Sequence, residues 1–145
     1  MTRDLIIAIG NVARGDDGVA HDVAARLLAV GLGAEVRVMT AVGLDVAMAA
    51  DVAESARLIV IDAERREAPA VAIGAIEPGT AAHSGHAIDA PGLLAVTAAL
   101  YGAAPGALLV SVAAPEMGHG EVLSAIAQAA SEEATRTIVG LLGEG

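Results

Sequence analysis

The chain contains no cysteine among its 145 residues. This absence excludes a disulfide framework, a thiol nucleophile and a metal site built from thiolates. Any metal ion bound by the protein must therefore be held by histidine, aspartate, glutamate or backbone groups.

Lysine, phenylalanine and tryptophan are also absent, and Tyr101 is the only tyrosine. The core must therefore be built from valine, isoleucine, leucine, alanine and methionine. The formal net charge is -10, and the eight basic residues are all arginines that form no cluster in the sequence. We expect no nucleic-acid partner, because a chain with this charge repels phosphates.

The N-terminus lacks a long hydrophobic run. Leu5 to Ile9 is too short to span a membrane, and no cleavage site made of small residues follows it. We therefore expect a cytoplasmic protein with no membrane insertion. The length fits a single domain over residues 1–145.

Apolar runs alternate with segments of helical period along the chain. Val19, Val23 and Leu27 recur at the four-residue spacing of a helix that packs on a sheet. The patterns predict strands at 4–9, 34–39, 56–63 and 106–114, an edge strand at 71–79, and helices at 17–30, 43–55, Pro91 to about Gly102, and 120–142. Such alternation predicts an α/β fold with a mostly parallel sheet and helices on both faces, that is, a three-layer α/β/α arrangement.

Several residues that can bind metals or transfer protons follow the predicted strands. Asp16 and Asp17 come after the first strand, Asp62 ends the third, and His83 and His86 lie in a loop at 80–90. Ligands of such sheets bind outside the carboxyl ends of the strands, and the first and third strands are commonly neighbours. Two carboxylates and an imidazole there would form a divalent-metal site or an acid/base site.

Each of these residues also has a structural interpretation. Asp16 and Asp17 could stabilise the N-terminus of the following helix, and Asp62 could simply end its strand. The two loop histidines could be ordinary surface residues. We also expect the following residues at the surface: His21, His119 and the charged run "ERRE" at 64–67.

Three segments taken together resemble the nickel-iron hydrogenase maturation endopeptidases. They are "IGNVARGDDGVA" followed by an amphipathic helix, "LIVIDA" at the end of the third strand, and "SGHAIDAPGLLAV" before a helix. The similarity extends from residue 5 to about 116, where Pro115 and Glu116 follow the last strand. The turn after the second strand departs from the family pattern, because only Gly43, Leu44 and Asp45 are similar there.

The resemblance implies a fold, a five-stranded sheet between helices, and it also implies a peptidase activity. Members of this family remove a C-terminal extension from the hydrogenase large-subunit precursor after nickel has been inserted. Residue by residue, it implies that Asp17, Asp62 and His86 are catalytic and contact nickel, or zinc or cadmium as substitutes. His86 is preferred to His83 because Ser84-Gly85-His86 stands in the matching register. A supporting loop would be formed by Asn11, Asp16 and Gly18.

The role of the nickel stays open at this stage. A metal ion could polarise the scissile carbonyl or activate water, or nickel already in the precursor could anchor recognition while an aspartate acts as general base. We expect a monomer whose partner is the precursor. Two alternatives are a non-catalytic metal-dependent chaperone of the hydrogenase subunit and, less favoured, a receiver-like magnesium-binding phosphoacceptor domain. The receiver domain requires a lysine near the last strand, and this chain has none.

Overall fold

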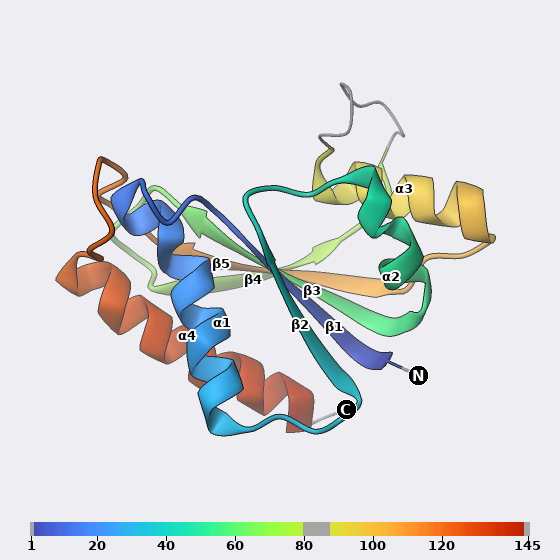
Figure 1. Ribbon diagram of the computed structural model, residues 1–145, viewed down its shortest axis with the longest axis horizontal. Helices are drawn as coiled ribbons and strands as arrows, with labels where there is room; N and C mark the ends of the chain where they lie inside the picture. The colour runs from blue at the N-terminus through green and yellow to red at the C-terminus, as the bar shows by residue number, and fades with distance from the viewer. Residues whose placement is uncertain (1, 80–87, 144–145) are drawn as a thin grey trace.

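The fold consists of one five-stranded sheet between two pairs of helices. The computed structural model describes residues 2–79 and 88–143. Its strands are β1 (Thr2–Ile9), β2 (Val36–Ala41), β3 (Ser55–Glu64), β4 (Val71–Ile76) and β5 (Gly106–Ala113). Its α-helices are α1 (Val19–Val30), α2 (Ala49–Ala53), α3 (Ala90–Tyr101) and α4 (Ala125–Gly143). Figure 1 shows α1 and α4 on one face of the sheet and α2 and α3 on the other.

The strand order is β2-β1-β3-β5-β4, and every neighbouring pair is parallel except β4 and β5. The predicted three-layer architecture with a mostly parallel, five-stranded sheet is therefore confirmed. The weakly alternating segment at 71–79 contains β4, which is the edge strand expected there. Since β1 and β3 are adjacent in the sheet, their carboxyl ends lie side by side.

The ends of several elements differ from the sequence-based expectation. The predicted helix 17–30 is a 3-10 turn at Gly15–Gly18 followed by α1, and the predicted strand 34–39 is shifted to Val36–Ala41. The Ala-rich helix 43–55 is shortened to a 3-10 turn at Val46–Met48 and α2, because Asp45 caps its start by accepting a hydrogen bond from Ala47 N.

The C-terminal helix begins later than residue 120. Ser124 Oγ accepts a hydrogen bond from Ala127 N at 3.2 Å, as an N-cap residue does, and α4 starts at the next residue, Ala125. Among the described helices, none has both the length and the apolar character needed to cross a membrane.

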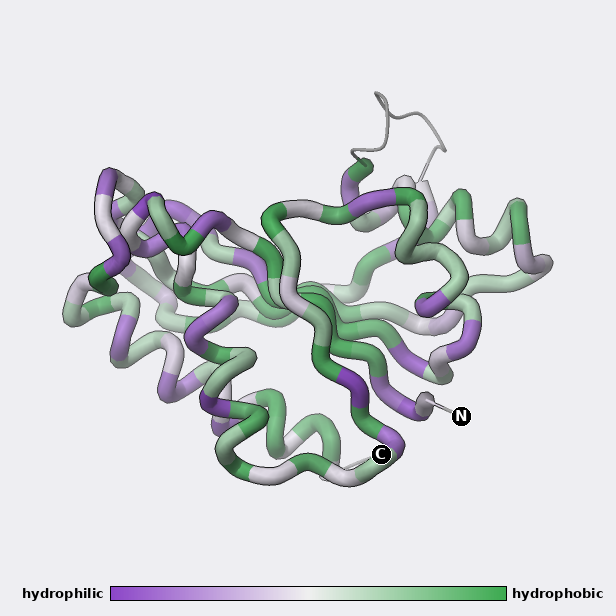
Figure 2. The backbone as a smooth tube through the Cα atoms, viewed as in Figure 1, coloured by the Kyte–Doolittle hydropathy of each residue, from purple (hydrophilic) through white to green (hydrophobic). Residues whose placement is uncertain are grey.

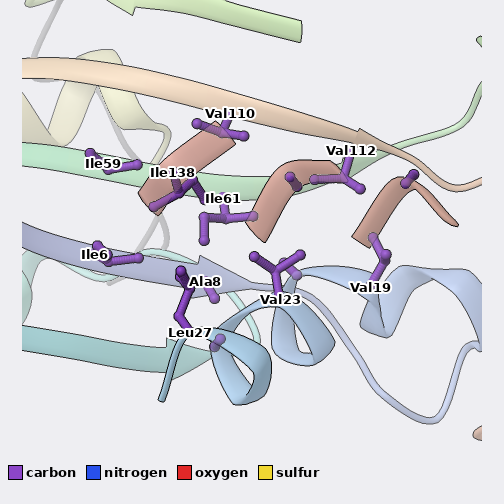
Figure 3. Packing of buried hydrophobic residues seen from close by; sticks show 14 of the residues in the cluster. Ile6, Ala8, Val19, Val23, Leu27, Ile59, Ile61, Val110, Val112 and Ile138 are labelled. Atoms are coloured by element: carbon purple, nitrogen blue, oxygen red, sulfur yellow. The ribbon is translucent and has the colours of Figure 1, made fainter. Parts of the chain in front are cut away.

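The core is divided by the sheet into two layers. On one face, Ile6, Ile59 and Ile61 pack against α1 and α4 (Figure 3). On the other face, Leu5 and Leu58 pack with residues of α2 and α3. Strands β1 and β3 therefore bury both of their faces, which is why they appear in the sequence as continuous apolar runs. Figure 2 shows these strands as hydrophobic segments at the centre of the molecule.

Neighbouring residues of α4 provide a test of this packing. Ile138 is fully buried against the sheet, whereas 37% of Val139 is exposed. Ile138→Ala is expected to lower the free energy of unfolding by about 2–5 kcal/mol, because it leaves a cavity in the core. Val139→Ala should cost less than about 1 kcal/mol. Urea denaturation followed by circular dichroism measures both, and equal losses would contradict the assigned faces of α4.

Candidate functional site

The two predicted catalytic carboxylates lie at neighbouring strand ends. Asp62 is near the end of β3, where it is paired with Ile9 of β1 on one side and Ser111 of β5 on the other. Asp17 lies in the 3-10 turn that follows β1. Both side chains are half-buried. The expected convergence of the first and third strand ends is thus present in the structure.

The loop after β1 is held close to Asp17 by its own backbone. Asn11 N donates a hydrogen bond to Asp17 Oδ2 at 3.0 Å. Gly10 has a φ of +150°, and a Cβ at this position would lie 2.0 Å from the carbonyl oxygen of Asp17. A Cβ on Gly18 would lie 2.9 Å from Val12 Cα. The glycines at both positions therefore let the loop fold tightly enough to place the Asp17 carboxylate at the strand end.

Asp16 has a different role from its neighbour. Its carboxylate is fully buried and accepts hydrogen bonds from Glu116 N at 2.9 Å, Ser124 N at 2.7 Å and Ser124 Oγ at 2.7 Å. Asp16 lies in the first turn after β1, but its side chain makes no hydrogen bond that caps this turn. Its hydrogen bonds instead connect the loop after β1 to the loop between β5 and α4. Figure 1 shows these two loops side by side.

The electrostatic environment of Asp62 links it to Asp17. Burial raises the pKa of the Asp62 carboxyl above its ordinary value, and the negative charges of Asp17 and Glu64 raise it further. A hydrogen bond from the backbone of Ala63 acts in the opposite direction. Within residues 2–79 and 88–143, neither Asp17 nor Asp62 forms an ion pair. Two carboxylates that repel each other without a cationic partner favour binding of a cation.

The predicted imidazole cannot be placed relative to these carboxylates. His86 and the alternative His83 lie outside the described residues. Within the part of the chain that the structure describes, no three His, Asp or Glu side chains are grouped so that they could hold a metal ion. The described site therefore contains two of the three predicted ligands, and the third stays a prediction.

A groove beside Asp62 was not predicted from the sequence. It has a volume of about 360 Å³, and its lining includes Asp62, Ile9, Leu44, Val60, Ile88, Pro91 and Leu109. Leu44 lies in the segment after β2, and Ile88 immediately precedes Asp89, the N-cap residue of α3. Their spacing along the chain follows no single period, so only the folded arrangement shows that they meet.

The structure corrects the surface assignments of His21 and Arg66, whereas the other three residues of the "ERRE" run are exposed, as expected. His21 is half-buried, and its Nε2 lies 3.0 Å from the carbonyl oxygen of Ala41, at the end of β2. Arg66 of the "ERRE" run bonds to Ser111 Oγ at 3.0 Å and to the Ser111 carbonyl at 3.1 Å. These two residues help to hold loops at the carboxyl edge of the sheet. His119 is exposed, as expected.

The fold and the site together define a three-layer α/β protein with paired carboxylates at the carboxyl ends of two adjacent strands. The same fold occurs in hydrogenase maturation proteases of known structure. A hydrogenase 2 maturation peptidase from Thaumarchaeota archaeon SCGC_AB-539-E09 superposes with a TM-score of 0.73 at 24% identity, covering 98% of this chain and 99% of that one. The resemblance noted in the sequence is thus confirmed at the level of the fold.

Two further structures extend this similarity. The hydrogenase maturating endopeptidase HybD from E. coli superposes with a TM-score of 0.77 at 21% identity, covering 99% of this chain and 93% of that one. The [NiFe] hydrogenase maturation protease HycI from Thermococcus kodakarensis KOD1 has a TM-score of 0.74 at 21% identity, with coverages of 98% and 93%. No protein-family model and no curated protein sequence matches the chain.

The buried Asp16 carboxylate leads to a prediction about stability. Asp16→Ala removes the acceptor of three hydrogen bonds and is expected to lower the free energy of unfolding by about 3 kcal/mol. Ser124→Ala removes one of these donors and the N-cap acceptor of α4, and should cost about 2 kcal/mol. Urea denaturation of both variants measures the difference. A loss for Asp16→Ala no larger than that for Ser124→Ala would contradict the role assigned to Asp16.

The raised pKa of Asp62 predicts a pH-dependent stability. The pKa of Asp62 is higher in the folded protein than in the unfolded chain, so between these two values the folded protein binds more protons at this group. The free energy of unfolding therefore falls as pH rises through this interval. Asp62→Asn is therefore expected to raise the thermal midpoint near pH 7, and the gain should shrink as pH falls toward about 4. Thermal unfolding with a chelator present measures this, and a difference independent of pH would contradict it.

Proposed function

We propose that this protein is an endopeptidase that removes the C-terminal extension of a nickel-iron hydrogenase large-subunit precursor after nickel insertion. The observation that carries the proposal is the position of Asp17 and Asp62 at adjacent strand ends, in a fold shared with proteins that are named hydrogenase maturation proteases. The proposal includes action in the cytoplasm as a monomer, with the precursor as its partner.

The donor set fits a divalent metal ion. Carboxylate oxygens from Asp17 and Asp62, together with an imidazole nitrogen from His86, would suit nickel, and zinc or cadmium as substitutes. The mutual repulsion of the two carboxylates, which contributes to the raised pKa of Asp62, would be relieved by a cation between them. A metal ion bound there would polarise the scissile carbonyl or lower the pKa of a water molecule.

The protein's own residues would position the substrate. The groove beside Asp62 offers an apolar lining that includes Leu44, Ile88 and Leu109, on which side chains next to the cleaved bond could pack. An aspartate at this position could act as general base if the nickel of the precursor serves only for recognition. Both roles require Asp17 to stay at the strand end beside Asp62, and the tight loop at Gly10 and Gly18 favours this position.

The test is the intact mass of a nickel-loaded large-subunit precursor from the same cell, before and after incubation with the protein. Wild type is expected to release a C-terminal peptide, whereas Asp17→Ala, Asp62→Ala and His86→Ala should reduce processing at least about a hundredfold. Asp51→Ala is a matched control, because it removes an aspartate that pairs with Arg37 at the surface. This control should process the precursor at the wild-type rate.

The same experiment distinguishes the remaining alternatives. An unchanged precursor mass, together with stable binding of the precursor, would overturn the protease assignment and favour a metal-dependent chaperone. Circular dichroism of the three variants checks that their folds are intact. If Asp17→Ala unfolded the chain, a structural role of this carboxylate would account for the loss of activity instead.

A further inference from the structure

A second hollow lies at the same edge of the sheet, formed in part by the loop between β5 and α4. It has a volume of about 580 Å³, and its lining includes Arg65, Glu116, Met117, His119, Val122 and Leu123. We refer to it as the Arg65 cleft. None of these residues belongs to the carboxylate site, so the function proposed above leaves the cleft unassigned.

Arg65 is an exposed cation without a partner in the described part of the chain. It forms no ion pair and no side-chain hydrogen bond there. The adjacent Arg66, by contrast, bonds to Glu64 at 2.6 Å, to the Pro69 carbonyl at 2.8 Å and to Ser111. The second arginine of the "ERRE" run thus fixes the chain after β3, while the first faces the cleft with its donors available.

The opposite wall of the cleft is held firmly. Gly15 N donates a hydrogen bond to the Gly120 carbonyl at 2.7 Å, and Gly120 N donates one to the Ala13 carbonyl at 3.0 Å. The buried carboxylate of Asp16 holds the same loop through the backbone of Glu116 and Ser124. The cleft is therefore built from anchored segments, which lowers the entropic cost of binding a ligand.

The cleft is close to the carboxylate site along the chain. Arg65 comes three residues after Asp62, a separation of about 10 Å along an extended strand. Asp62 itself lines the groove on the face covered by α2 and α3, whereas the Arg65 cleft adjoins the loop that leads into α4. A polypeptide crossing the strand ends could occupy both hollows at once.

We propose that the Arg65 cleft binds an acidic segment of the protein substrate, outside the cleaved bond. This inference rests on the proposed function. Arg65 supplies a planar set of donors that matches a carboxylate, and Met117, Val122 and Leu123 supply apolar surface for neighbouring peptide side chains. Glu116 in the same cleft repels anions, and this repulsion is weaker for a singly charged carboxylate than for a doubly charged phosphate. In a chain of net charge -10, an arginine that has no ion pair within the described residues gives the cleft a local preference for an acidic ligand.

The test uses charge reversal and the nickel-loaded large-subunit precursor. Arg65→Glu is expected to raise both the KM of precursor processing and the Kd of precursor binding about tenfold, with kcat unchanged. For Arg65→Lys, both constants should stay within about threefold of the wild-type values. Arg136→Glu is the matched control, because Arg136 is also exposed and lacks an ion pair in the described residues. It changes the net charge by the same amount and should leave both constants unchanged.

The outcomes separate this inference from the proposed function. If wild type processed the precursor and Arg65→Glu had the same KM and Kd as wild type, only the proposal of an acidic-segment site would be overturned. If wild type bound the precursor without cleaving it, the endopeptidase assignment would fail, and the Kd values of the two charge reversals would still decide the role of Arg65. A precursor that is neither bound nor cleaved would overturn both. A final arm adds about 10 mM inorganic phosphate, with sodium chloride at equal ionic strength as the control. If phosphate weakened precursor binding more than sodium chloride did, the cleft would be a phosphate site and not a carboxylate site.

Discussion

The parallel pairing of β1 with β3 is the constraint on which the site depends. It sets Ile9 beside Asp62, so the turn that leaves β1 must begin next to the end of β3. The pairing is held by buried aliphatic side chains on both faces, and a slip by one residue would exchange the two core layers. The hydrophobic pattern therefore determines where the carboxylates of Asp17 and Asp62 meet, although neither residue belongs to the core.

The two adjacent aspartates after β1, Asp16 and Asp17, have different roles. Asp16 is fully buried and has its negative charge balanced by three hydrogen-bond donors, whereas Asp17 keeps a half-buried carboxylate beside a second acid. The hydrogen bonds of Asp16 fix the loop before α4, and the same loop forms a wall of the Arg65 cleft. A single turn thus supports both the site at the strand ends and the surface beside it.

The sequence predicts those features that follow from periodicity and from the order of elements. Continuous apolar runs identified β1, β3 and β5, and alternation with helices predicted the parallel sheet and its carboxyl edge. The partners of Asp16, His21 and Arg66 could not be predicted, because each contacts a segment distant in sequence or an irregular loop. The groove beside Asp62 could not be predicted for the same reason, since its lining residues come from five separate parts of the chain.

Ionisation of Asp62 is unfavourable in the folded protein when no cation lies beside it. Burial and the charge of Asp17 both disfavour the ionised form of Asp62, and the described residues offer no arginine to compensate. The fully buried acids of the described chain are stabilised in two ways: Asp4 pairs with Arg3 at 2.7 Å and Arg57 at 2.6 Å, and Asp16 accepts three hydrogen bonds. Asp17 and Asp62 are half-buried and form no such ion pair within the described residues, which supports the cation site proposed above.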